Sequence, residues 1–147
     1  MAIRNILKGA DETLRKVCRS QLTFDDRLAQ LLDDMKETMY KADGCGLAAS
    51  QIGVLRRVCI VDVGDGLIEL VNPVIIESSG IQTEEEGCLS FPGEYGKTKR
   101  PMNVTVRAQD RNGNTFTVSG SGLKARAFCH EIDHLDGKVF KDRLIKG

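Results

Sequence analysis

The sequence predicts an α+β fold in which a mainly antiparallel sheet packs with an N-terminal helix and a central helix that carries a histidine pair. Apolar residues recur at helical spacing between Phe24 and Met39, and alternating or β-branched segments follow them. A second helical segment then carries the pattern His-Glu-x-x-His. The 147 residues suit one domain over 1–147, because the sequence shows neither a repeat nor a linker-like composition.

The N-terminal helix is expected to begin with Thr23 as its N-cap and to end near residues 42–44. Its stripe of Leu and Met residues is interpreted as core packing rather than as a cofactor site. A shorter helix is expected over residues 11–18. Residues 44–53 contain three glycines and are interpreted as a loop.

Strands are predicted over 57–63, 67–72 and 74–78, with Pro73 separating the last two. Residues 103–109 and 115–119 alternate around Asn112-Gly113, which predicts a hairpin. The basic run 97–100 is interpreted as a solvated turn. The helix that carries the histidines is expected over 123–136, with Gly137 as its C′ residue.

The composition excludes some partners and indicates a compartment. Lys plus Arg and Asp plus Glu both number 21, so nothing favours broad attraction to nucleic acid or to an anionic membrane. We expect no membrane partner and no sequence-specific nucleic acid. The N-terminus lacks the apolar run of a signal peptide, and the five cysteines are odd in number without a C-x-x-C pair. These features predict a cytoplasmic protein with reduced thiols.

The two histidines of the chain, His130 and His134, are separated by one helical turn in His-Glu-Ile-Asp-His. Residues i and i+4 share a helix face, so both imidazoles can bind one cation. Glu131 is rotated away from that face and can lie beside the metal as an acid/base group. The alternative is a surface helix that carries these residues by chance. The absence of any other histidine favours the metal site.

A catalytic site of this kind uses three protein ligands and leaves one position open for water. Cys88, in Glu-Gly-Cys-Leu-Ser and expected in a loop, is the best candidate for the third ligand, because a cation favours its thiolate. Cys18, Cys59 and Cys129 are interpreted as buried hydrophobic residues. Cys45, in the glycine-containing loop, stays ambiguous.

Three segments together resemble the peptide deformylase family. They are Gly-Cys-Gly-Leu-Ala-Ala-Ser-Gln at 44–51, Glu-Gly-Cys-Leu-Ser at 86–90 and His-Glu-Ile-Asp-His at 130–134. Their order and separation also match, and the similarity extends from about residue 14 to 140. The resemblance implies hydrolytic removal of the formyl group from the N-terminal formyl-methionine of new polypeptides, with release of formate. Nascent chains at the ribosome are therefore possible partners.

The resemblance assigns roles to individual residues. Cys88, His130 and His134 would hold the ion, and Glu131 would act as general base and then as acid. The Gln51 side chain and the Leu89 backbone N–H would stabilise the oxyanion. Cys45 and Gly46 are candidate substrate contacts. Without the resemblance, Gln51 would be interpreted as an exposed loop residue.

The resemblance also concerns neighbouring residues. Arg126, one turn before His130, is expected to line the methionine pocket with its stem and to keep its head in solvent. Glu86 is expected to pair with Arg100. Asp133 either orients a neighbouring group or is a surface carboxylate.

The sequence departs from the family pattern at three places. Cys129 stands where the family usually has Gln. Tyr95 lies near the position of a substrate-contacting Arg in some members. The sequence ends soon after residue 144, where many members continue into a C-terminal helix, so that helix is expected to be absent.

One thiolate and two imidazoles suit several divalent ions. The resemblance implies Fe²⁺ as the native ion, with Zn²⁺, Ni²⁺ or Co²⁺ as replacements. Two other functions compete with this prediction. A zinc peptidase would use the same helix but would leave the segments around Cys88 and Gln51 without a role. A structural metal site in a binding protein would need four protein ligands.

Overall fold

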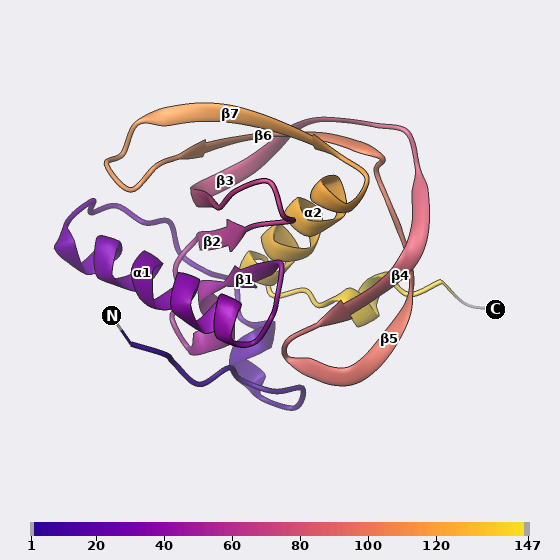
Figure 1. Cartoon of the computed structure of the whole chain (residues 1–147), viewed down its shortest axis with the longest axis horizontal. Coiled ribbons are helices and arrows are strands. Elements are labelled where there is room, and N and C mark those ends of the chain that lie inside the picture. Colours follow the sequence, from indigo (N-terminus) through magenta and orange to yellow (C-terminus); the bar gives the residue numbers. More distant parts are fainter. Residues whose placement is uncertain (1, 146–147) are drawn as a thin grey trace.

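The computed structural model describes residues 2–145 and has the predicted α+β class (Figure 1). The regular elements in chain order are η1 (Glu12–Arg15), α1 (Asp26–Lys41), β1 (Gly46–Ala48), η2 (Ala49–Ile52), β2 (Val58–Val61), β3 (Ile68–Ser79), β4 (Gln82–Cys88), β5 (Phe91–Arg100), β6 (Asn103–Gln109), β7 (Thr115–Ser121), α2 (Leu123–Leu135) and η3 (Phe140–Arg143). The η elements are short 3₁₀ helices. None of the helices within residues 2–145 is long and apolar enough to cross a membrane.

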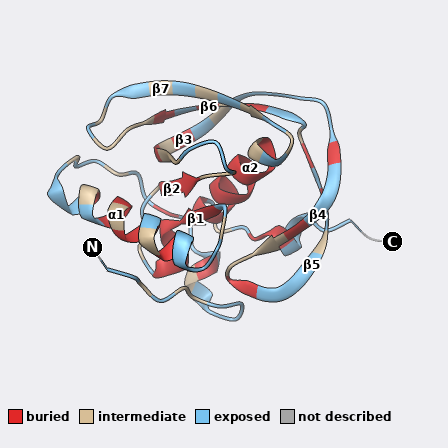
Figure 2. Cartoon of the chain, viewed as in Figure 1, coloured by how far each residue is buried: buried red, intermediate tan, exposed pale blue. Residues whose placement is uncertain are grey.

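The main sheet has the strand order β1-β2-β3-β6-β7 and is antiparallel throughout. Strand β2 is buried on both faces, because successive side chains point to opposite sides of the sheet. Cys59 and Val61 pack in the core cluster that contains α2, whereas Val58 and Ile60 pack in the cluster that contains α1. The helix with the histidine pair is therefore fixed against the centre of the molecule, where Figure 2 shows it buried.

Strands β4 and β5 form a separate antiparallel hairpin beside the C-terminal segment (Figure 1). This hairpin was not predicted, and the interpretation of residues 97–100 as a solvated turn is wrong. These residues belong to β5, where Thr98 and Arg100 are buried while Lys97 and Lys99 are exposed. Cys88 likewise ends β4 instead of lying in a loop.

Several predicted boundaries need correction. The N-cap of α1 is Asp25, whose carboxylate accepts from the backbone N–H groups of Arg27 and Leu28, and not Thr23. Strand β3 continues through Pro73, because an irregularity in its pairing with β6 absorbs the residue without an N–H. Of the loop expected over 44–53, residues 46–48 form β1 and 49–52 form η2. The helix expected over 11–18 is reduced to η1.

The hairpin at Asn112-Gly113 and the second helix are confirmed. Gly113 has φ 87°, a left-handed conformation that favours glycine. Gly137 follows α2 with φ 75°, and a Cβ atom there would lie 2.5 Å from the carbonyl oxygen of Arg15. Only glycine fits this helix end, where Cys18 N–H donates to the Leu135 carbonyl.

Candidate metal centre and active site

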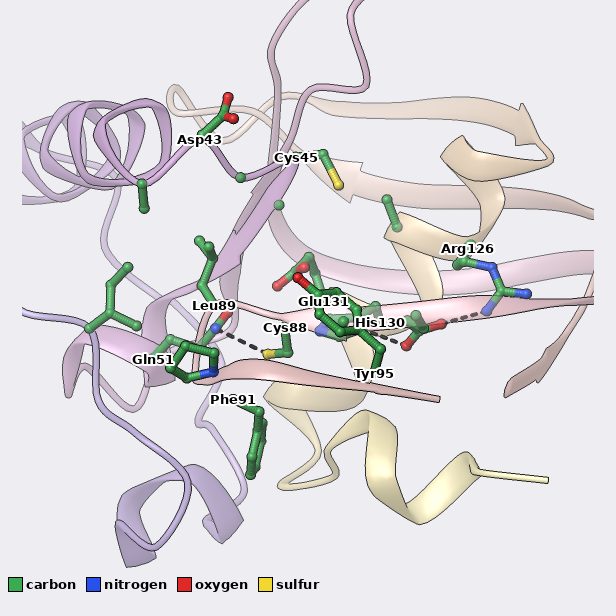
Figure 3. A pocket seen from close by; sticks show the side chains of 18 of the residues that line it. Asp43, Cys45, Gln51, Cys88, Leu89, Phe91, Tyr95, Arg126, His130 and Glu131 are labelled. Carbon is green, nitrogen blue, oxygen red and sulfur yellow. Dashed lines mark hydrogen bonds and ion pairs between the residues drawn. The ribbon is translucent and has the colours of Figure 1, made fainter. Parts of the chain in front are cut away.

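Three potential ligand atoms, from Cys88, His130 and His134, converge where the end of β4 meets α2. Figure 3 shows two of these residues, Cys88 and His130, close together. The Nε2 atoms of His130 and His134 lie 3.2 Å apart, and His134 Nε2 lies 3.3 Å from Cys88 Sγ. All three ligand atoms lie within 4.8 Å of one another. The structure thus brings together the three residues that were predicted as ligands. His130 and His134 lie one turn apart on α2, and Cys88 lies at the end of β4.

The distances from His134 Nε2 to the other two donor atoms fit ligands of one divalent ion. Tetrahedral bonds of ordinary zinc length place two nitrogen ligands about 3.3 Å apart and a sulfur about 3.6 Å from each nitrogen. The separations of 3.2 and 3.3 Å are close to these values. Burial and the neighbouring His130 hold the pKa of His134 well below its usual range, which leaves a neutral imidazole with a lone pair. Within residues 2–145 the set holds three protein ligands, the number of an open site.

Glu86 fixes the orientation of His130. Its carboxylate accepts from His130 Nδ1 at 2.6 Å, from Arg100 Nη2 at 2.8 Å, from Arg126 Nη1 at 2.7 Å and from Thr98 Oγ1 at 2.8 Å. Burial alone would raise the pKa of Glu86, but the hydrogen bonds from His130 and Arg100 hold it well below its usual range. A carboxylate at Nδ1 assigns the proton to that nitrogen and aims the Nε2 lone pair at the site.

Glu131 occupies a buried position beside these ligands. The side chain is 4% exposed, and its Oε1 has no hydrogen-bond partner within the described residues. Burial raises the pKa of Glu131 from 4.5 to about 7. A carboxyl group with such a pKa can both accept and return a proton near neutral pH.

Gln51 is 1% exposed, so the alternative of an exposed loop residue is wrong. Its Oε1 accepts from Ala48 N–H at 2.9 Å, which directs the Nε2 group toward Ser90 Oγ at 3.1 Å and Cys88 Sγ at 3.6 Å (Figure 3). The amide N–H groups therefore face Cys88, one of the three candidate ligands. The sequence did not single out Ser90, although its position two residues after Cys88 was a usable signal.

A cavity of about 550 Å³ opens at this centre and contains the other nominated residues. Its walls include Cys45, Gly46, Leu89, Arg126 and Glu131. The Leu89 side chain packs on Gly44, where a Cβ atom would lie 2.6 Å from Leu89 Cδ1. Glycine at position 44 thus keeps the segment after Cys88 close to β1.

The expectation that the Arg126 head lies in solvent is wrong. Arg126 is 4% exposed, and its guanidinium donates to Glu86, to Thr98 and to Gln82 Oε1 at 3.3 Å. These partners come from β4 and β5, which the sequence did not predict. Glu86 pairs with Arg100 as expected, through Arg100 Nε at 3.2 Å and Nη2 at 2.8 Å. Asp133 is buried, so it is not a surface carboxylate.

The remaining cysteines do not join the ligand set. Cys18, Cys59 and Cys129 are buried in the core cluster around α2, as expected for small hydrophobic residues. Cys45 is the exposed cysteine at the cavity wall.

A helix with His-Glu-x-x-His, a cysteine as third ligand and a buried carboxyl group beside them defines a metal-dependent hydrolase. The family model of polypeptide deformylase matches residues 3–147. A peptide deformylase from Acetivibrio thermocellus is 56% identical over 99% of this chain and 86% of its own length. One from Caldicellulosiruptor bescii is 55% identical over 99% of this chain and 88% of its own length.

Solved structures agree with these relatives. The crystal structure of peptide deformylase from Thermotoga maritima superposes with a TM-score of 0.97 at 37% identity and covers 99% of this chain and 100% of that one. A peptide deformylase from Legionella pneumophila gives 0.95 at 48% identity, over 98% of this chain and 87% of that one. The chain belongs to the peptide deformylase family. It is a hydrolase of protein biosynthesis that removes the N-formyl group from newly made polypeptides.

Proposed function

We propose that Cys88, His130 and His134 hold one divalent ion, natively Fe²⁺, and that the adjoining cavity takes formyl-methionyl peptides. The convergence of the three ligand atoms within 4.8 Å carries this proposal. When bound, the ion lowers the pKa of water and polarises the formyl carbonyl. The residues around it supply the proton transfers and the alignment.

Glu131 acts as the general base and then as the general acid. Its unpaired Oε1 accepts a proton from the attacking water and returns it to the departing amine nitrogen. The site then releases formate and a peptide with a free N-terminus. The pKa of about 7 lets one carboxyl group serve both steps at neutral pH.

The Gln51 amide and the Leu89 backbone N–H stabilise the negative charge that develops on the formyl oxygen. Removing one such donor typically costs about 100- to 1,000-fold in turnover. Gln51 suits this role because Ala48 and Ser90 fix its amide in place before substrate arrives.

Cys45, Gly46 and Arg126 form the proposed substrate-contacting wall. Glycine at 46 lets a peptide backbone approach β1 closely. The head of Arg126 is occupied by Glu86 and Thr98. An arginine neutralised in this way presents its apolar stem to the cavity, which suits the side chain of methionine.

The ion and the cellular location follow from the chemistry of the ligands. A mixed thiolate and imidazole set accepts Fe²⁺, and Zn²⁺, Ni²⁺ or Co²⁺ can replace it. Ferrous iron beside a thiolate is sensitive to oxygen. We further propose that the protein works in the cytoplasm on chains emerging from the ribosome, a location that its free cysteines support.

Anaerobic purification, metal analysis and a formyl-Met-Ala assay on one sample test this proposal. We expect one iron per chain and equimolar formate and free peptide. Cleavage of internal peptide bonds without formate release would instead indicate a peptidase. Cys88→Ala is expected to lose both the ion and turnover, and full metal content in that variant would remove Cys88 from the ligand set.

A further inference from the structure

We propose that the C-terminal turn η3 braces the metal centre and that Arg143 is a positioning residue for His130. The inference rests on the proposed ligand set and goes beyond it, because Arg143 lies outside the cavity wall. Two independent contacts connect η3 to His130. One is a chain of ion pairs, and the other is a stacked aromatic ring.

The ion-pair chain begins at Arg143, whose guanidinium donates two hydrogen bonds to the Asp133 carboxylate. Arg143 Nε lies 3.1 Å from Asp133 Oδ2, and Nη2 lies 3.0 Å from Oδ1. The Asp133 side chain is 12% exposed and lies between the two histidines in the sequence of α2. Two parallel bonds fix the plane of the carboxylate, which a single bond would not do.

The same carboxylate orients Arg100 toward the metal centre. Asp133 Oδ2 accepts from Arg100 Nη1 at 2.6 Å, and Arg100 Nη2 donates to Glu86 at 2.8 Å. Glu86 then accepts from His130 Nδ1 at 2.6 Å. Arg143 is therefore connected to the candidate ligand His130 through Asp133, Arg100 and Glu86, which are all buried. When one of these groups loses a hydrogen-bond partner, water cannot replace that partner.

The aromatic contact comes from Phe140 at the start of η3. Its ring is 2% exposed and stacks on His130 with centroids 6.2 Å apart and an interplanar angle of 19°. Phe140 also meets Phe91 edge to face at 5.7 Å, and Phe91 pairs with Cys88 across the β4–β5 turn. Through Phe140, η3 thus contacts His130 on α2 directly and the strand pair that carries Cys88 by way of Phe91.

The turn is itself anchored to β5. Leu144 bridges to Thr98, and Ile145 N–H donates to the Lys97 carbonyl at 2.9 Å, so the segment after η3 pairs with β5. Arg15 also pairs with Asp142 at 2.5 Å, but both side chains are partly exposed, so this ion pair contributes little to the anchoring. Arg143 is held by this framework and not by its own pair with Asp133. A change at position 143 should therefore leave the turn in place.

Substitution of Arg143 by Gln tests the brace, with Co²⁺ as the probe. Outer partners of ligating histidines typically contribute 10- to 100-fold to metal affinity. Arg143 acts through three intermediates and is 42% exposed, so we expect about 10-fold weaker Co²⁺ binding, measured by competition with a chelator. The visible spectrum of the Co²⁺ protein should also change, because the His130 ring becomes free to tilt.

Two variants make the comparison specific. Arg143→Lys keeps the charge but loses the two-nitrogen grip, so it should recover part of the affinity. Arg15→Gln removes an ion pair of the same turn that does not touch Asp133, and it should leave affinity and spectrum unchanged. Should Arg143→Gln fail to fold, Phe140→Leu tests the second contact and is expected to shift the same spectrum.

The outcomes separate the brace from the metal centre. Wild-type affinity and an unchanged spectrum in Arg143→Gln would overturn the brace while leaving the ligand set intact. Equal losses in Arg143→Gln and Arg15→Gln would also overturn it, because they would indicate general loosening of the turn. Absence of thiolate-to-cobalt absorption in the wild type would overturn the Cys88 site, and the brace with it.

Discussion

Gly46 and Glu131 lie so close that no side chain fits between them. A Cβ atom on Gly46 would overlap the Glu131 carboxylate and would lie 2.9 Å from its Cδ. Glycine at this point in β1 is therefore required by a buried carboxyl group on α2, and not by the backbone conformation of the strand. The contact aligns the proposed general base with the proposed substrate wall.

We expect Gly46→Ala to lower formate release by at least about 100-fold, because the added methyl group displaces Glu131 from its place beside the ligands. Metal content should remain near that of the wild type. The matched control is Gly9→Ala, where the new Cβ would meet Phe91 at an ordinary 3.4 Å. Equal turnover in the two variants would show that the Gly46 contact does not position the base.

At neutral pH, Glu131 should lower the free energy of unfolding of the metal-free protein. Its pKa is about 7 in the folded state and near 4.5 in the unfolded chain. Between these pH values the group ionises in the unfolded chain but stays protonated in the folded protein, so ionisation stabilises the unfolded state relative to the folded state. Stability from this group is complete below about pH 4.5 and is lost as the pH rises through about 7. The difference corresponds to roughly 3 kcal/mol above pH 7.

Glu131→Gln removes the ionisation and should therefore stabilise the metal-free protein at pH 8 by up to about 3 kcal/mol. At pH 5 the same substitution should change the free energy of unfolding very little. Urea denaturation of both proteins at the two pH values measures this. An identical effect at pH 5 and pH 8 would contradict the assigned cause.

Ser90 should affect turnover because it holds the Gln51 amide in position. Ser90→Ala removes the Oγ that accepts from Gln51 Nε2 and leaves that nitrogen with its longer contact to Cys88 Sγ, so we expect about 10-fold lower kcat. Ser50→Ala is the matched control, because Ser50 is equally buried but makes no hydrogen bond to the Gln51 side chain. Equal kcat values for the two variants would remove the positioning role of Ser90.

The elements with strong local signals were predictable from the sequence. The Asn112-Gly113 hairpin and the helix that ends before Gly137 depend on glycines whose positive φ angles are local requirements. The three candidate metal ligands could also be predicted from the sequence. The spacing of His130 and His134 fixes their relative position, and a catalytic site needs a third protein ligand.

The β4–β5 hairpin was not predictable in the same way. Its strands contain many charged residues and glycines, and they form a separate two-stranded sheet, so their alternation does not stand out in the sequence. This omission led to the wrong environment for Arg126, whose buried partners Glu86 and Thr98 come from those strands. Contacts between residues 28 to 44 positions apart are tertiary, and no local pattern encodes them.

Glu131 is proposed to perform proton transfer beside an ion held by Cys88, His130 and His134. Formate release from formyl-Met-Ala, measured with metal content for anaerobically prepared wild type and Glu131→Gln, tests it most directly. We expect one ion per chain in both proteins and turnover only in the wild type. Formate release at the wild-type rate by metal-loaded Glu131→Gln would contradict it.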